Sequence, residues 1–416
     1  MVTPVPRRLM RDRAEGRERV TNVELFFDLV YVFAVTQLSH HLLPHPTAAR
    51  ALQTALLLAM VWLVWAYTTW LTNWLDPERI PVRLLLIALM LVSLVMSAAL
   101  PRAFGDSGLL IGLAYALMQI GRSVFAVWAL QGQPLVRNFQ RILAWCCVSG
   151  GLAVAGGLTA SVYPRALFWL LAVGVDGAGG IAGFYTPGLG RSTTREWDIE
   201  GGHFAERCQA FILIALGESI VVIGATLAGL LRPLSLPQAD RTPTIAAFVV
   251  AFIGSAALWW LYFDRSAGEA AKLIAESDDP GRIGRSAYHL IHPIMVACII
   301  VIAAADDLVL ARPDAVGVSS TSWLILGGTG LYIAGHLAFT LTAWRRLSWS
   351  RVGGLILIAL LSLVAPHVTA LGLSACAAAV VVAVAATDYA RRRSPLDGEP
   401  GRSGLEPSPD PRSADG

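Results

Sequence analysis

The chain has 416 residues, of which 55% are hydrophobic and only 15% are charged, and its mean hydropathy is +0.60. Soluble globular proteins carry about 25% charged residues, so this composition excludes a soluble enzyme and predicts a polytopic membrane protein. The net charge of +3 does not indicate a nucleic-acid partner, because the basic residues lie in segments between apolar runs.

A basic segment, residues 1–20, opens the chain and is followed by a long apolar run without a cleavage-site pattern. We expect this run to remain as a membrane span rather than to be removed as a signal peptide. A spanning helix needs about 20 mostly apolar residues. This length predicts an all-α bundle of about twelve transmembrane helices, over residues 22–43, 48–72, 82–100, 108–130, 139–161, 164–184, 204–231, 243–263, 284–308, 319–343, 352–366 and 368–390.

The spans divide into two similar sets of six, a first half over residues 21–185 and a second half over 204–390. In the fourth helices, LMQIGRSVF matches LYIAGHLAF, which puts Arg122 and His336 at one position. In the second helices, Tyr67 matches Tyr262. Because each half has an even number of helices, the pattern predicts tandem repeats in parallel orientation.

Arginines gather in alternate loops, and the loops between them hold mostly single arginines. The positive-inside rule therefore predicts a plasma-membrane protein with both termini in the cytoplasm. On this orientation residues 1–20 form a cytoplasmic tail and residues 186–203 a cytoplasmic linker. The polar, proline-rich residues 391–416 form a second tail, expected to be disordered.

Two spans carry carboxylates inside their apolar runs: Glu24 and Asp28 in the first, Glu206 and Glu218 in the seventh. Such a charge costs about 2.5–3.5 kcal/mol at mid-membrane. Since residues four apart share a helix face, Glu24 and Asp28 should both point into the protein. Glu218 lies deepest in its run and is the leading candidate for a functional carboxylate. Arginines such as Arg207 offer the alternative of purely structural pairing.

Other polar residues within spans are Arg122, Asp176 and His336. His289 and His292, three residues apart, should share one helix face at the start of the ninth span. These groups can pair with one another or form a proton relay, because histidine titrates near neutral pH. Arg122 as a structural ion-pair partner remains an open alternative.

No metal or cofactor is expected, because His289 and His292 would need further ligands that no spacing supplies. The five cysteines also lack metal-ligand spacing, and no signature of a soluble enzyme or nucleotide-binding loop is present. We therefore expect no catalytic residues. Asp306 and Asp307, at the end of the ninth apolar run, are expected to be solvated.

Two stretches, VELFFDLVYVFAVTQLSHHL at Val23–Leu42 and HFAERCQAFILIALGESIVVIG at His203–Gly224, closely resemble the bacterial low temperature requirement A family. The resemblance covers about residues 18–390. It implies an integral membrane protein, associated by name with growth in the cold and without an established biochemical activity. The residues that match the family pattern are Glu24, Asp28, Gln37, His203, Glu206, Arg207, Gly217 and Glu218.

Three functions stay open. The first is a secondary transporter, in one version proton-coupled, that moves a small solute, with Glu218 as the proton or substrate carboxylate and Glu24 with Asp28 as its counterpart. Arg122 and His336 would then be paired gating residues. The second is a membrane stress sensor or scaffold without transport activity. The third is an intramembrane enzyme that modifies lipid with His289 and His292. The partners expected are the lipid bilayer, an unknown solute and protons.

Overall fold

The computed structural model describes residues 9–11, 20–193, 201–230, 242–264 and 284–393. Within these residues, twelve helices are long and apolar enough to cross a membrane. This confirms the predicted all-α polytopic bundle. Most of the basic segment 1–20 and of the tail 391–416, and part of the linker 186–203, lie outside the described residues.

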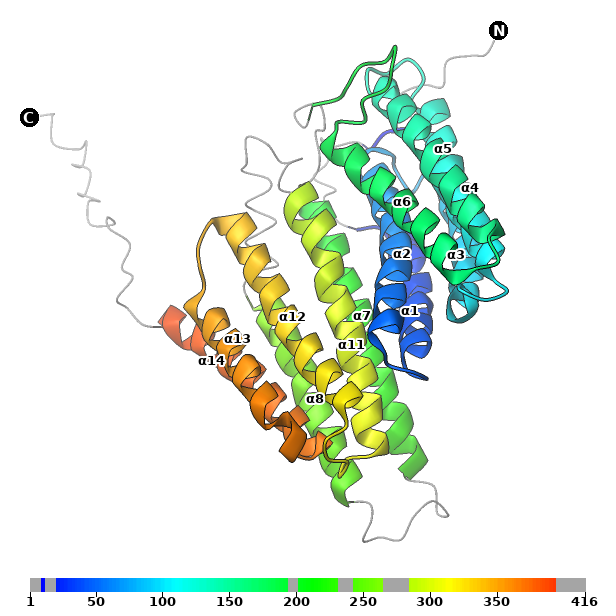
Figure 1. The fold of residues 1–416 in the computed structure, drawn as a ribbon. Helices are drawn as coiled ribbons and strands as arrows, with labels where there is room; N and C mark the ends of the chain where they lie inside the picture. Colours follow the sequence, from blue (N-terminus) through cyan, green and yellow to red (C-terminus); the bar gives the residue numbers. More distant parts are fainter. Residues whose placement is uncertain (1–8, 12–19, 194–200, 231–241, 265–283, 394–416) are drawn as a thin grey trace, which may run out of the picture.

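The first half consists of α1 (Asn22–Leu42), α2 (Ala48–Trp74), α3 (Ile80–Ala99), α4 (Gly108–Ala129), α5 (Val136–Leu158) and α6 (Val162–Ile181). It forms one side of the molecule (Figure 1). Glycines allow α4 and α5 to approach closely, because a Cβ at Gly112 would lie 2.4 Å from the carbonyl oxygen of Ala153. Small residues of this kind are what membrane helices use to bring their backbones together.

The second half consists of α7 (Gly201–Leu230), α8 (Thr242–Phe263), α11 (His292–Ala311), α12 (Ser319–Trp344), α13 (Trp349–Val364) and α14 (Ala370–Arg393). A π-helix over Gly284–Ile291 precedes α11. A short 3-10 helix, Ala365–His367, separates α13 from α14, so the expected boundary at Pro366 is correct.

The observed helices begin and end within a few residues of the predicted spans. Several ends differ by three residues; α5, for example, begins at Val136 rather than at residue 139. The first turn of α5 contains Arg137 and Asn138, and hydropathy alone does not assign such residues to a span. A helix can extend past the apolar run that predicts it.

The two halves have the same order of neighbouring helices. In the first half, α1 packs on α3 and α2 packs on α6, while α3, α4, α5 and α6 pack in succession. In the second half, α7 packs on α11 and α8 packs on α14, while α11, α12, α13 and α14 pack in succession. The halves meet where α1 contacts α7 and α11. We call the end of the bundle where α1 begins the first end.

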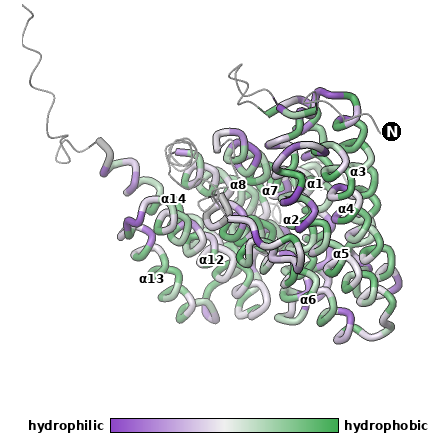
Figure 2. The backbone as a smooth tube through the Cα atoms, turned by 90° about the horizontal axis from the view of Figure 1, so that it is seen from above, coloured by the Kyte–Doolittle hydropathy of each residue, from purple (hydrophilic) through white to green (hydrophobic). Residues whose placement is uncertain are grey.

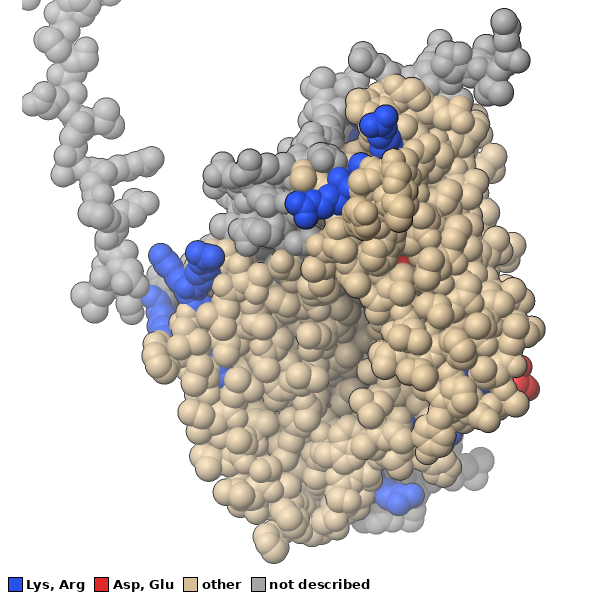
Figure 3. Space-filling model, turned by 45° about the horizontal axis from the view of Figure 1, so that its top comes forward, with Lys and Arg blue, Asp and Glu red and all other residues tan. Residues whose placement is uncertain are grey.

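Apolar side chains cover the outside of the bundle. On α3, Leu84 and Leu91 are exposed whereas Val82 and Leu86 are buried. The outward segments are mostly hydrophobic (Figure 2). The face in Figure 3 shows few charged side chains, most of them arginines near its rims, with an acidic side chain at the right edge. A lipid-facing surface has this composition.

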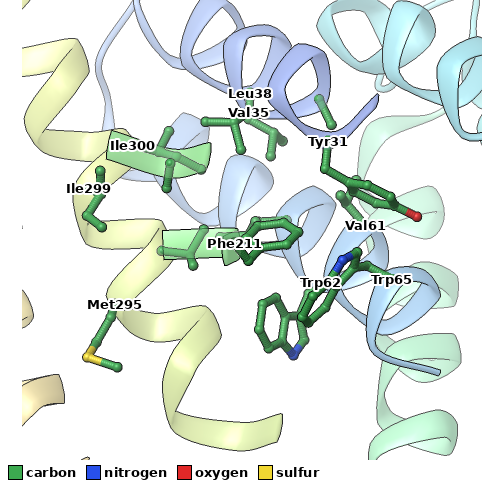
Figure 4. Packing of buried hydrophobic residues seen from close by; sticks show 14 of the residues in the cluster. Tyr31, Val35, Leu38, Val61, Trp62, Trp65, Phe211, Met295, Ile299 and Ile300 are labelled. Carbon is green, nitrogen blue, oxygen red and sulfur yellow. The ribbon is translucent and has the colours of Figure 1, made fainter. Parts of the chain in front are cut away.

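The middle of the bundle is closed by apolar and aromatic side chains from both halves (Figure 4). The ring of Phe211 on α7 lies 4.7 Å from that of Trp65 and 5.2 Å from that of Trp62. Tyr31, Val35, Leu38, Val61, Met295, Ile299 and Ile300 complete this core cluster.

Candidate functional site

The two acidic residues of α1 bind one arginine of α7. Arg207 donates to both carboxylate oxygens of Asp28, over 2.9 and 2.6 Å, and to Glu24 over 3.1 Å. All three side chains are buried. Trp65 adds a hydrogen bond of 2.7 Å to Asp28. The four-residue spacing of Glu24 and Asp28 thus brings both to a single guanidinium, which offsets the cost of burying them.

Glu24 has further partners at the first end. His203 Nε2 lies 2.9 Å from one carboxylate oxygen, and Arg11 donates to the other over 3.1 Å. Arg11 is held there because its amide donates to the carbonyl of Trp74 over 2.8 Å. Sequence reasoning missed Arg11, which lies in the basic segment and shows no motif. With two carboxylates and two guanidiniums, this cluster is balanced in charge.

Glu206 does not join the cluster. It is exposed, and one of its carboxylate oxygens accepts a hydrogen bond from the amide of Val20 over 3.2 Å. It lies one residue before Arg207 and therefore on another face of α7. Glu206 and Glu24 accordingly have different surroundings.

A cavity of about 350 Å³ lies at the first end, between α2, α4, α5 and α6 and the π-helix that precedes α11. Its lining includes Arg122, Asp176 and His289. The fold thus brings together three of the residues proposed from the sequence. Aromatic rings of Tyr67, Trp70, Trp74, Phe139 and Phe184 form much of the remaining wall.

Arg122 and Asp176, both in the cavity wall, are joined by Gln119. The Gln119 amide nitrogen donates to Asp176 over 2.5 Å, and its oxygen accepts from Arg122 over 2.5 Å. The Tyr115 hydroxyl also donates to Asp176, over 2.5 Å. No direct ion pair joins the two charges in the described residues. Arg122 also donates to the carbonyl of Val64 over 3.3 Å, so a rotation of Gln119 would remove one hydrogen-bond partner from each charged group without freeing either.

Asp176 keeps some hydrogen-bonding capacity. Its Oδ2 accepts both bonds above, whereas Oδ1 accepts none from a described side chain. The Ser149 hydroxyl lies beside this carboxylate but donates to the carbonyl of Cys146. Arg122 also lies over the ring of Tyr67, 5.0 Å from its centroid, and the Tyr67 hydroxyl donates to the Asp176 carbonyl over 2.9 Å.

Residues 182–193 fold over the mouth of the cavity. Gly183 has a φ of +63° and accepts a hydrogen bond from the Ser192 amide over 2.8 Å. A Cβ at Gly183 would lie 2.3 Å from the Ser192 carbonyl oxygen, so only glycine fits this turn. Arg141 fixes the segment by donating twice to the Leu189 carbonyl, over 3.0 and 2.5 Å. Part of the predicted linker is thus an ordered cover.

Glu218 lies outside the cavity, farther along the α1–α7 contact. The Thr36 hydroxyl of α1 donates to its carboxylate over 2.5 Å. The side chain is buried, and His40 and Asp307 are its ionisable neighbours. Glu218 is therefore separated from Glu24 and Asp28, to which the transporter hypothesis related it.

His336 lies in the second half, in a buried group of aromatic and basic side chains. Arg351 donates to its Nδ1 over 3.1 Å and forms an ion pair of 3.0 Å with Asp388. His292 lies next to it, with the hydroxyl of Tyr262 2.6 Å from Nε2. These contacts give His336 a structural environment away from the cavity.

His289 and His292 do not share one face. The ring of His289 lies beside Tyr67 at the cavity, with centroids 6.1 Å apart, whereas His292 packs against Tyr262 and Tyr288. His289 belongs to the π-helix, whose wider turn breaks the α-helical relation between residues three apart. Within the described residues, no three metal-ligating side chains converge.

Asp306 is not solvated, contrary to expectation. Only 6% of its surface is exposed, and it lies among α8, α12 and α14. The helix α11 continues to Ala311, so Asp306 sits inside a span rather than at its end. Asp307, next to it, is partly exposed.

Comparisons with known proteins agree with this architecture. The family model described as bacterial low temperature requirement A protein (LtrA) matches residues 19–386. A protein of Rhizobium meliloti (strain 1021), described as uncharacterized, is 35% identical over 382 residues, which is 91% of each chain. No solved structure matches. The matched region includes the whole first half and the second half up to residue 386.

Proposed function

The chain belongs to the bacterial low temperature requirement A (LtrA) family of multi-pass membrane proteins, and we propose that it is a secondary transporter that binds a small solute in the cavity beside Arg122 and Asp176. One observation carries the proposal: an open cavity of about 350 Å³ at the boundary of the two halves, with an arginine and an aspartate in its wall. Intramembrane ionisable residues mark substrate and ion pathways.

The cavity has the size and lining of a site for a small molecule. Ligand pockets are mostly apolar, with a few polar groups that fix orientation. Here the aromatic wall supplies the apolar part, and Arg122, Asp176 and His289 supply the polar part. Arg191 at the mouth adds a second positive charge, which favours solutes with an anionic group.

A transporter must open to one side at a time. The cavity lies at the first end, and the core cluster around Phe211 closes the middle of the bundle. This arrangement fits one state of an alternating-access cycle. On the orientation expected from the arginines, the first end faces the cytoplasm of a bacterial cell and both termini lie on that side.

The proposed movement is a rocking of two repeated halves. Three features support the repeat: the shared order of neighbouring helices, the contact of Tyr67 with Arg122, and the packing of Tyr262 near His336 at the matching positions. The contact between Thr36 and Glu218 joins the two halves. Parallel repeats are related by an axis along the membrane normal.

The other acidic residues take separate roles in this mechanism. Glu24 and Asp28 are fully paired with Arg207 and join the halves at the first end. Glu218 is held by a single short hydrogen bond from Thr36, so it is the carboxylate best placed to gain and lose a proton.

No described contact favours the sensor or scaffold, and the separation of His289 from His292 disfavours a lipid-modifying enzyme.

Solute counterflow in proteoliposomes tests the proposal. Vesicles loaded with an unlabelled solute are diluted into the labelled form, with amino acids, carboxylates and amines as the panel. We expect accumulation of at least one solute, reduced at least about tenfold in Arg122→Gln, which costs about 1.4 kcal/mol or more of binding. The control is Arg102→Gln, whose exposed side chain pairs only with Asp106. Equal solute accumulation in both variants would show that the cavity is not part of the transport pathway.

A further inference from the structure

A second, smaller pocket surrounds Asp306 in the second half. It has a volume of about 30 Å³ and is lined by residues of α8, α11, α12 and α14. Its lining holds three polar side chains, those of Asp306, Thr329 and Ser374, among apolar neighbours such as Leu258 and Ile302. A space of this size holds one water-sized particle, and therefore a single ion without its hydration shell.

The three polar side chains have no partner among the described residues. No hydrogen bond or ion pair reaches the carboxylate of Asp306, and neither hydroxyl is engaged. Their exposed fractions are only 6% for Asp306, 6% for Thr329 and 8% for Ser374. By contrast, Glu24, Asp28, Asp176 and Glu218 each accept at least one hydrogen bond.

A buried carboxylate within a membrane span needs compensation for its charge. We propose that the pocket binds one Na⁺ ion, with the carboxylate of Asp306 and the hydroxyls of Thr329 and Ser374 as ligands. All three donors are oxygen, which suits a hard cation. One carboxylate neutralises one positive charge, whereas a divalent ion would leave a net charge buried.

The pocket is linked to Glu218 through α11. Asp306 faces α8 and α14, while Asp307, the next residue, is a charged neighbour of Glu218. An ion that fixes the position of α11 against α8 and α14 also fixes the surroundings of Glu218. The role of Na⁺ as a coupling ion rests on the proposed transport function, but the binding of Na⁺ does not.

Thermal unfolding of the purified full-length protein tests the site. The midpoint is followed by tryptophan fluorescence while NaCl replaces choline chloride at constant ionic strength, and KCl serves as a second replacement. A ligand that binds only the folded state raises the midpoint with its concentration. We expect a saturable rise with Na⁺, a smaller one with K⁺ and none in Asp306→Asn.

Three further variants make the test more specific. Asp307→Asn, which removes the adjacent but partly exposed carboxylate, should keep the wild-type response. Ser374→Ala retains the carboxylate and should need at least about tenfold more Na⁺ for half of the effect. Ser374→Ala and Thr329→Val carry the test if Asp306→Asn does not fold.

An equal response to Na⁺, K⁺ and choline, or a Na⁺ response that persists in Asp306→Asn, would overturn the proposal. In that case Asp306 is compensated by a proton. The counterflow experiment distinguishes the two proposals. Solute exchange without stabilisation by Na⁺ would contradict only the ion site. Stabilisation by Na⁺ without exchange of any solute would contradict only the transport function.

Discussion

Glu24 of α1 and Arg207 of α7 are 183 residues apart in sequence, yet their side chains meet over 3.1 Å with no exposed surface on either. Asp28 and His203 extend this contact on both helices. The pair therefore joins the first half of the chain to the second at the first end of the bundle. The two motif stretches of the sequence are the two sides of this junction.

Arg207→Ala should destabilise the protein strongly. The substitution leaves Glu24 and Asp28 buried without their shared guanidinium, and removing one partner of a buried pair costs about 3–5 kcal/mol. The measurement is the thermal unfolding midpoint in detergent. The control is Arg79→Ala, because Arg79 is 54% exposed and pairs with Asp76 at the surface. Similar midpoints for the two variants would contradict the role assigned to Arg207.

Gly112→Ala should loosen the contact between α4 and α5. A Cβ there would lie 2.4 Å from the carbonyl oxygen of Ala153, so the helices must separate, which typically costs about 1–3 kcal/mol. Gly121→Ala, on the same helix, places its Cβ 3.9 Å from the nearest atom, Leu117 Cδ1. It should be neutral or stabilising, by up to about 1 kcal/mol. Equal melting of the two variants would refute the close approach.

Gln119→Leu should impair solute binding more than it impairs folding. The change removes the bridge between Arg122 and Asp176, and an unsatisfied buried group costs about 1–3 kcal/mol. We expect a loss of counterflow at near-wild-type expression. Ser123→Ala is the control, since Ser123 lines the cavity but donates to the Gln119 carbonyl within its own helix. Unchanged counterflow in Gln119→Leu would show that the bridge is only structural.

Gly183→Ala should disturb the cover of the cavity. The left-handed φ and the short distance to Ser192 both oppose a side chain. Gly188 has a similar φ of +80°, but a Cβ added there would meet no atom within 4 Å, so Gly188→Ala carries only the backbone cost of about 1–2 kcal/mol. The apparent solute affinity should fall in Gly183→Ala and stay near wild type in Gly188→Ala. A fall in solute affinity in Gly188→Ala but not in Gly183→Ala would show that this turn of the cover does not contribute to the binding site.

The fold could be predicted from sequence because membrane spans follow from length and hydropathy alone. Even the break at Pro366 between two adjoining helices was visible. The junction between the halves could be predicted in part, because the spacing of Glu24 and Asp28 predicted a shared inward face. The identity of their partner was open, because Arg207 lies in another span and only packing brings it close.

Other parts of the site could not be predicted. Gln119 is an uncharged residue in an apolar run, so nothing distinguished it until Arg122 and Asp176 were seen to meet it. His289 and His292 were wrongly placed on one face because sequence does not reveal a π-helix. Asp306 was wrongly assigned to solvent because a charged residue lowers the local hydropathy, so the apolar run ends before the helix does.

Solute-dependent proton flux is the most direct measurement of the proposed transport function. Proteoliposomes containing a lumenal pH dye would receive the solute panel under an imposed membrane potential, with wild type beside Glu218→Gln and Thr36→Val. We expect proton movement that requires a solute, is absent in Glu218→Gln and persists at a reduced rate in Thr36→Val, since Thr36 only donates a hydrogen bond to Glu218. Folded wild-type protein that moves neither protons nor any solute of the panel would contradict proton-coupled transport.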